Sequence, residues 1–160
     1  MQIAQEMGIL NQGDLVVQTA GTLTGISGST DLIKVGLVRK IVSRGISIGE
    51  VGVTGKARII KNNLDMSLIC PGEILFVPKE LMQNIPLSKN IVGIVTNQNV
   101  NDVYAFFNKN NKKISTICNL ENIDNHQISN GDLITLQLNE GVIYMGQIED
   151  DDAIDKYKYV

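Results

Sequence analysis

Short runs of apolar and β-branched residues, each followed by polar or turn-forming residues, dominate this sequence of 160 residues. Runs of this length and composition are typical of strands. After residue 50 they read GVTGKARII, GEILFVP, IVGIVT, KKISTIC, DLITLQL and GVIYMGQ. The stretch VNDVYAFFNKN, between the third and fourth runs, instead repeats apolar residues at helical spacing: Val100, Val103 with Tyr104, and Phe107. The pattern predicts a mostly β domain with one central helix whose aromatic residues pack in the core.

The first 40 residues form a smaller piece. Ile3, Met7 and Leu10 lie at helical spacing and precede turn-forming residues at 11–14, which predicts a short helix that ends there. Two strand-like runs follow, LVVQTAG and DLIKVGLV, joined by the loop GTLTGISGST. One helix and two strands bury too little apolar surface to be stable alone, so we expect another surface to cover this piece.

A connection separates the two pieces. In RKIVSRGISIGEV, residues 39–51, polar residues and glycines interrupt the apolar alternation, and no complete helix fits. We place the domain boundary near Ser43. The expected organisation is an α/β piece plus connection over 1–43, a second domain over 44–148, and an acidic tail over 149–160.

Three of the strand-like runs begin in the same way, with a glycine, an acid and an aliphatic residue. The triplets are Gly13-Asp14-Leu15, Gly72-Glu73-Ile74 and Gly131-Asp132-Leu133. Glycine readily adopts the positive φ of tight turns, and an acidic side chain can accept a local hydrogen bond from the backbone. We therefore attribute the echo to turn chemistry rather than to internal duplication.

Charge and composition exclude several classes of protein. With 43% hydrophobic and 19% charged residues, the chain has the composition of a folded globular protein. A net charge of −3, and no Lys/Arg cluster interleaved with aromatic residues, argue against a nucleic-acid partner. No apolar run approaches the roughly 20 residues of a membrane-spanning helix, and the start MQIAQEMGIL lacks the features of a signal peptide. We expect no membrane partner and a cytoplasmic location.

Few residues could carry catalysis or bind a metal. His126 is the single histidine and lies in a polar loop, so we interpret it as solvated. Cys70 and Cys118 do not have the spacing of a zinc or redox motif. The acids Glu149 to Asp152 are consecutive and would point in different directions, unlike a metal cage. We predict no catalytic residue, no metal site and no cofactor.

One loop has a composition suited to phosphate. In it, Gly25 and Gly28 let the backbone approach a ligand, while Ser27, Ser29 and Thr30 add hydroxyl groups to successive N–H donors. These five residues are the candidate binding site. The alternative interpretation is a tight connection between two strands.

The stretch GDLVVQTAGTLTGISGSTDLIKV, residues 13–35, resembles the closing segment of pyruvate kinase. In that family the usual form is GD-I/L-VV-x-TAG, then a loop of glycine, serine and threonine, then N-L/T-x-K/R-V. The resemblance implies that the loop of Gly25 to Thr30 closes over a sugar phosphate or nucleotide effector. Because the earlier serine/threonine-rich loop of that site has no counterpart here, the resemblance implies half an effector site. The catalytic barrel of the family also has no counterpart.

Residues 44–147 resemble the extra C-terminal domain of some bacterial pyruvate kinases, which is similar to the mobile phosphohistidine domain of phosphoenolpyruvate-utilising enzymes. The agreeing segments are GVTGKARII, GEILFVP, GIVTN and GDLITLQLNEGVIYMG. The implied fold class is α/β, with a swivelling β/β/α domain preceded by part of the pyruvate kinase C-terminal domain. In active relatives GIVTE leads into GG-x-TSHAA, whose histidine accepts phosphate. Here Asn99 and Val100 replace the two glycines and the histidine position falls near Val103, so we expect phosphotransfer to be lost.

The resulting hypothesis is a non-catalytic regulatory and assembly region of a pyruvate kinase, an enzyme that converts phosphoenolpyruvate to pyruvate with ATP formation. Its expected partners are a second copy of the chain, through residues 13–38, and an upstream catalytic barrel. A sugar phosphate or nucleotide effector is a further expected ligand. Two alternatives stay open: a free-standing phosphometabolite-binding module, and a phosphoenolpyruvate-dependent phosphocarrier domain.

Overall fold

The computed structural model describes residues 4, 7–11, 14–20, 32–121, 123 and 127–148. The chain divides into two compact units, Met1–Lys40 with Glu149–Val160, and Ile41–Ile148. Within the described residues, no helix is long and apolar enough to cross a bilayer.

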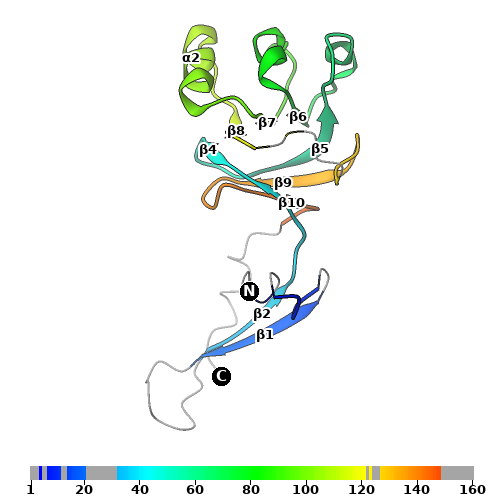
Figure 1. Ribbon diagram of the computed structural model, residues 1–160, viewed down its shortest axis with the longest axis vertical. Helices are drawn as coiled ribbons and strands as arrows, with labels where there is room; N and C mark the ends of the chain where they lie inside the picture. The colour runs from blue at the N-terminus through cyan, green and yellow to red at the C-terminus, as the bar shows by residue number, and fades with distance from the viewer. Residues whose placement is uncertain are drawn as a thin grey trace. The chain divides into compact units, whose positions relative to one another are not determined.

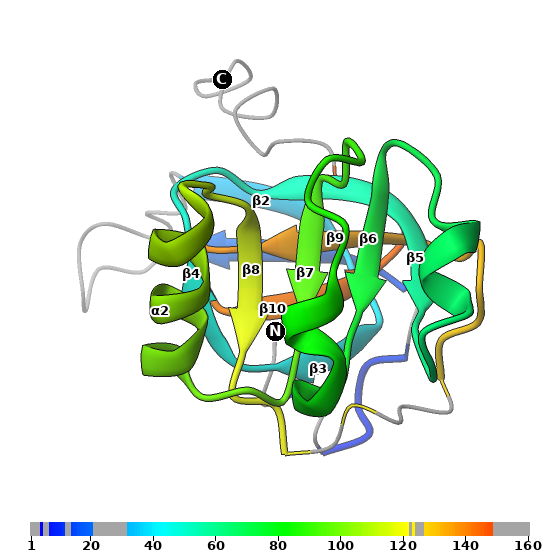
Figure 2. The ribbon, with the colours of Figure 1, turned by 90° about the horizontal axis from the view of Figure 1, so that it is seen from above.

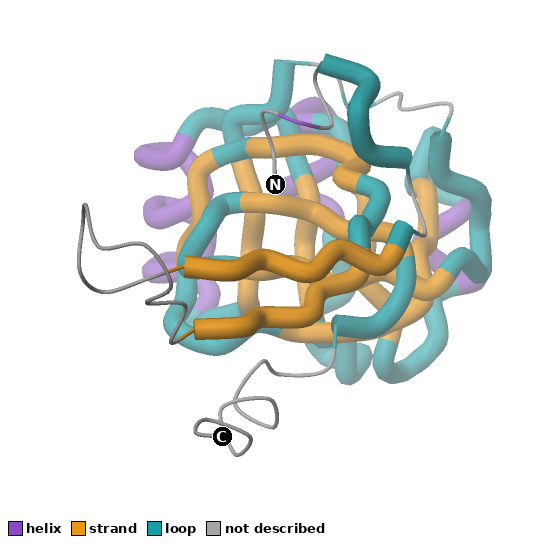
Figure 3. Tube along the Cα trace, turned by 90° about the horizontal axis from the view of Figure 1, so that it is seen from below, coloured by secondary structure: helices purple, strands orange, loops and turns teal. Residues whose placement is uncertain are grey.

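The first unit contains a β-hairpin. Strands β1 (Leu15–Ala20) and β2 (Leu32–Leu37) pair antiparallel, with Val17 opposite Val35 (Figure 3). Both strands coincide with runs predicted from the sequence. The predicted helix does not extend to Leu10, because residues 7–10 form a turn in which Gly8 has a φ of 70°. A positive φ interrupts helical geometry.

The second unit is built on a mixed sheet of eight strands. Its strands are β3 (Ile41–Arg44), β4 (Ile46–Ile48), β5 (Val53–Ile59), β6 (Glu73–Phe76), β7 (Gly93–Val95), β8 (Ser115–Cys118), β9 (Leu133–Gln137) and β10 (Val142–Met145). They lie in the order β3-β10-β9-β5-β6-β7-β8-β4 (Figure 2). The four strands from β5 to β8 are parallel, and the outer pairs are antiparallel.

One α-helix and two 3-10 helices lie on one side of this sheet (Figure 1). The helix α2 (Val100–Asn110) spans the predicted residues, while η1 (Asp65–Leu68) and η2 (Lys79–Asn84) lie in the β5–β6 and β6–β7 connections. The six strand-like runs after residue 50 each contain one strand, from β5 to β10. The prediction of a mostly β unit with one central helix is confirmed.

The segment expected to be a connection, residues 39–51, contains two strands instead. β3 and β4 are separated by Gly45 alone, yet they occupy opposite ends of the strand order. The sheet therefore curls until its two ends are joined by one residue. The Gly45 N–H donates to the carbonyl of Gly141 at 2.9 Å. The prediction was wrong because each strand is short and its partner, β10 or β8, is about 70 to 100 residues away in sequence.

The central strands are buried on both faces. In β6, Ile74 and Phe76 lie in a core cluster with Val95 of β7, inside the curled sheet. Leu75, between them, belongs to a second cluster, shared with the three helices. Two-sided burial explains why these runs are continuously apolar rather than alternating. The helix α2 contributes Val103, Phe106 and Phe107 to the second cluster.

The packing of α2 corrects one prediction. Tyr104, expected in the core, is 50% exposed. The buried stripe runs from Val103 to Phe106 and Phe107, at i, i+3 and i+4, and Tyr104 lies beside it on the helix surface.

The acids of the three glycine-acid triplets form local hydrogen bonds in turns, as predicted. Gly72 and Gly131 have φ of 81° and 91°. The side chains of Asp14, Glu73 and Asp132 each accept a hydrogen bond from the N–H three residues earlier, at 2.7, 2.8 and 2.8 Å. The acid thus stabilises the turn that starts each strand.

Candidate functional site

The predicted phosphate loop belongs to the segment of sequence between β1 and β2. Its residues Gly25, Ser27, Gly28, Ser29 and Thr30 lie outside the described residues. The same is true of His126 and of the acids at 149–152.

The start of α2, where the resemblance noted in the sequence predicted the position of a lost phosphate acceptor, is described in full. Asn99 is the N-cap, and its side chain accepts from the Asp102 N–H at 3.0 Å. The Asp102 carboxylate in turn accepts from the side-chain amides of Gln98, at 2.7 Å, and Asn99, at 2.5 Å. A carboxylate at this position interacts favourably with the helix dipole. The helix N-terminus is thus capped by the chain's own side chains.

Val103 stands at the position where the sequence suggested that the acceptor would fall. Its side chain is 0% exposed and belongs to the cluster between sheet and helices. An aliphatic side chain enclosed in a core has neither a nucleophilic atom nor access to a donor. Val103 itself therefore cannot accept a phosphoryl group.

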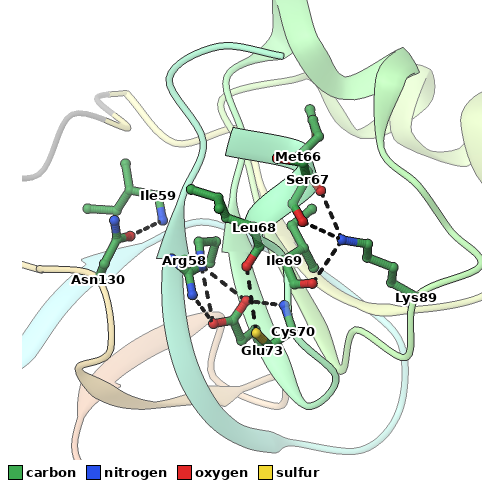
Figure 4. Close-up of polar contacts among 10 residues, drawn as sticks. All are labelled: Arg58, Ile59, Met66, Ser67, Leu68, Ile69, Cys70, Glu73, Lys89 and Asn130. Atoms are coloured by element: carbon green, nitrogen blue, oxygen red, sulfur yellow. Dashed lines mark hydrogen bonds and ion pairs between the residues drawn. The ribbon is translucent and has the colours of Figure 1, made fainter. Parts of the chain in front are cut away.

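A cluster of polar side chains in the second unit joins β5 to β6 (Figure 4). Arg58 Nη2 donates to Glu73 Oε1 at 2.6 Å, and Arg58 Nε donates to Oε1 and Oε2 at 3.2 and 3.1 Å. The Cys70 N–H donates to Glu73 Oε2 at 2.8 Å. Glu73 is only 5% exposed, so its charge depends on these donors.

Opposing effects act on the pKa of the Glu73 carboxyl group. Burial alone raises the pKa of a carboxyl group. Hydrogen bonds from Arg58 and the Cys70 N–H, together with the charges of Arg58 and Lys89, outweigh burial and hold the pKa of Glu73 below its ordinary value. Glu73 is therefore ionised at neutral pH, which suits a structural ion pair rather than a general acid.

Lys89 completes the cluster from the β6–β7 connection. Its Nζ donates to the carbonyls of Met66, Ser67 and Ile69 at 3.1, 3.0 and 2.9 Å (Figure 4). One ammonium group thereby holds two carbonyls of η1 and the carbonyl of Ile69, which follows it. The cluster was missed by sequence reasoning, which read Glu73 as turn chemistry alone. The available signal was the position of Glu73 at the start of a continuously apolar run. An acid at the first position of a buried strand becomes part of the sheet and needs a partner there.

Comparison with known proteins gives a consistent result. No family model matches the chain. Pyruvate kinase 2 of Synechocystis sp. is 34% identical over 148 residues, which are 92% of this chain and 25% of that enzyme. The chain is similar to pyruvate kinases along nine-tenths of its length. Pyruvate kinases of Staphylococcus saprophyticus and Lactobacillus delbrueckii subsp. bulgaricus are 29% and 25% identical over 89% and 92% of the chain.

The extent of these matches matters in two ways. Because residues 41–148 make up about two thirds of the chain, a match over 92% includes residues of both units. The chain spans about a quarter of the length of the pyruvate kinases it matches, so activity of the whole enzyme does not follow from the similarity.

Solved structures add no further argument. The microcin C7 self immunity protein MccF in complex with aspartyl sulfamoyl adenosine aligns with a TM-score of 0.46 at 14% identity, over 92% of this chain and 56% of that protein. Its inactive mutant aligns with a TM-score of 0.44 at 12% identity. Scores this low bear on neither the fold nor the function of this chain.

Proposed function

We propose that this chain is the C-terminal region of a pyruvate kinase and that it serves regulation and assembly rather than catalysis. The observation that carries the proposal is similarity to these enzymes through both units, over only a quarter of their length. The reaction of the parent enzyme, from phosphoenolpyruvate to pyruvate with ATP formation, then belongs to residues outside this chain.

Within this proposal, residues 41–148 act as a swivelling domain that no longer carries phosphate. The enclosed Val103 and the capped start of α2 support this role over the phosphocarrier alternative. The loop of Gly25 to Thr30 is the proposed effector half site, and the rest of that site would come from the parent enzyme.

The size of the native polypeptide tests the parentage. Antibodies against residues 41–148 should detect, in the source organism, a chain about four times as long as this one, which co-purifies with pyruvate kinase activity. The purified 160-residue chain should form no pyruvate from phosphoenolpyruvate and ADP. A native product of 17.5 kDa alone would contradict the proposal and favour a free-standing phosphometabolite-binding module.

The hairpin of the first unit supports an assembly role. The Val38 N–H donates to the Asp14 carbonyl at 2.8 Å, one step beyond the last pair of the ladder. Because hydrogen-bonded and non-hydrogen-bonded pairs alternate in antiparallel ladders, Val17 and Val35 form a non-hydrogen-bonded pair. The N–H and C=O of Val35 therefore point away from β1, toward the outer edge of β2. In the described part of the chain, β2 pairs only with β1.

Apolar side chains accompany this edge. Ile33 and Val35 of β2 are exposed, as are Leu15 and Val17 of β1. An edge with outward-facing backbone groups and exposed apolar residues favours pairing with another strand. We propose that β2 pairs with β2 of a second copy about a two-fold axis at Val35. This register sets Val35 opposite its own copy and Lys34 opposite Gly36, which avoids a like-charge pair.

Val35→Pro tests this edge with little disturbance of the hairpin, because the lost N–H points outward. Analytical ultracentrifugation should find a dimer or larger for the parent and a shift toward monomer for Val35→Pro. Val35→Thr is the matched control: it keeps the N–H and the branched shape, so it should stay associated. A parent that is monomeric at high micromolar concentration would exclude assembly through this strand.

A further inference from the structure

We propose that a pocket at the end of α2 binds a small organic anion that carries a planar ring. The pocket has a volume of about 840 Å³ and lies wholly within the second unit. None of its lining residues belongs to the Arg58–Glu73 cluster or to the predicted phosphate loop, and the proposal goes beyond the proposed function. Three segments line it: the β4–β5 connection, the second half of α2, and the turn between α2 and β8.

The most buried of the side chains that line the pocket are apolar, and we call them its floor. Ile48 and Phe107 are buried members of the core cluster, and the partly buried Ile114 packs against them. Two exposed apolar side chains stand above this floor, Tyr104 at 50% and Val51 at 70% exposure. A tyrosine ring half exposed beside an apolar floor offers a surface on which a planar ring can stack.

The rim is polar and carries a positive excess. Lys112 and Lys113 line the pocket, and neither ammonium group has an ion-pair partner among the described residues. Among the described residues, Glu50 is the single acid that lines it. The side-chain amides of Asn108 and Asn111 add hydrogen-bonding groups. Two free ammonium groups against one carboxylate favour an anionic ligand group.

The walls of the pocket are held in place by the fold. Ser115 Oγ donates to the Val51 carbonyl at 3.0 Å, and β4, which ends at Ile48, pairs with β8, which begins at Ser115 (Figure 2). Asn111 ends α2 in the left-handed region, with φ 50°, and so turns the chain toward Lys112 and Lys113. A pre-formed pocket with an apolar floor and few polar groups at its rim is typical of small-molecule sites.

The arrangement selects a ligand by two features together. A planar ring would rest on Tyr104 and Phe107, while a phosphate or carboxylate would reach Lys112 and Lys113. A simple anion lacks the apolar contact, and a neutral ring lacks the ionic one. A nucleoside monophosphate and an aryl carboxylate share this chemistry and differ in the anionic group.

An NMR titration of the full chain tests the proposal. The probes are adenosine monophosphate, indole-3-acetate, inorganic phosphate as an anion without a ring, and indole-3-ethanol as a ring without charge. At least one ring-bearing anion should shift the backbone amides of residues 48–51 and 104–115 with a submillimolar dissociation constant, on the order of 0.1–1 mM. The two anions distinguish a phosphate-bearing ligand from a carboxylate-bearing one.

Matched variants distinguish binding in the pocket from non-specific attraction of anions to lysine side chains. Tyr104→Ala, and Lys112→Glu with Lys113→Glu, should each weaken the binding at least about tenfold. Lys61→Glu with Lys79→Glu removes the same charge at exposed positions that do not line the pocket, and should leave the affinity within about twofold. Circular dichroism confirms that each variant is folded.

Three results would overturn the proposal. One is the absence of amide shifts in these residues with either ring-bearing anion up to about 5 mM. Another is equal weakening in the two double-lysine variants. The third is binding of inorganic phosphate as tight as that of the ring-bearing anions.

Discussion

Glu73→Ala should lower the free energy of unfolding by about 2–4 kcal/mol, because it leaves Arg58 and the Cys70 N–H without their acceptor. The value lies toward the lower end for broken buried pairs because the Arg58 side chain keeps 21% exposure. Urea denaturation at pH 7 measures the change. Glu80→Ala, at an exposed position, is the matched control and should change stability by less than about 0.5 kcal/mol.

The same pair should make stability depend on pH. The pKa of Glu73 is lower in the folded protein than its ordinary value of 4.5. Its stabilising contribution is therefore complete above the unfolded-state pKa and is lost as pH falls through the folded-state pKa. The difference in stability between the parent and Glu73→Ala should shrink as the pH falls below about 4. A difference that is constant from pH 7 to pH 3 would show that the ion pair contributes nothing.

Gly45→Ala should destabilise the second unit by about 2–3 kcal/mol, through overpacking where the sheet closes on itself. A Cβ at this position would lie 2.5 Å from the Cys118 carbonyl oxygen and 2.8 Å from Ile117 Cγ2. The carbonyl belongs to the β4–β8 ladder, so it can move away only if that pairing weakens. Thermal and urea denaturation of the two proteins measure the loss.

Gly131→Ala is the comparison for this variant. Gly131 has φ 91° but open space around its Cβ position, so alanine there should cost only the conformational strain, about 1–2 kcal/mol. Amide exchange adds a local readout, because Gly45→Ala should reduce protection in β4 and β8 more than in β9. If Gly45→Ala proves as stable as the parent, the single-residue closure of the sheet is incorrect.

Local patterns were sufficient to locate most elements. The strands β5 to β10 and the helix α2 were predicted because their apolar runs are continuous enough to be read without knowing their neighbours. The glycine-acid turns were also predictable, because each hydrogen bond joins residues three apart. The start of α2 at Asn99 and Val100 is local in the same sense, since the Asn99 side chain accepts from the N–H of Asp102, three residues later.

Features that join distant residues were decided by the tertiary structure alone. Gly45 looks like a loop glycine in the sequence, and only the pairing of β3 with β10 and β4 with β8 makes it the closure of the sheet. Arg58 and Glu73 are 15 residues apart and meet because β5 and β6 run parallel. Tyr104 belonged to the predicted apolar face but stays exposed, because the sheet beneath α2 covers a stripe centred on Val103.

The pocket is also a feature that only the tertiary structure decided. Lys112 and Lys113 begin the run KKISTIC, which was predicted as a strand, and Val51 ends the predicted connection. Only the pairing of β4 with β8 brings that connection to the end of α2, across more than 60 residues of sequence. Spacing along a chain predicts which residues share a face, but the number and position of neighbouring strands decide which part of that face is buried and which stays open to a ligand.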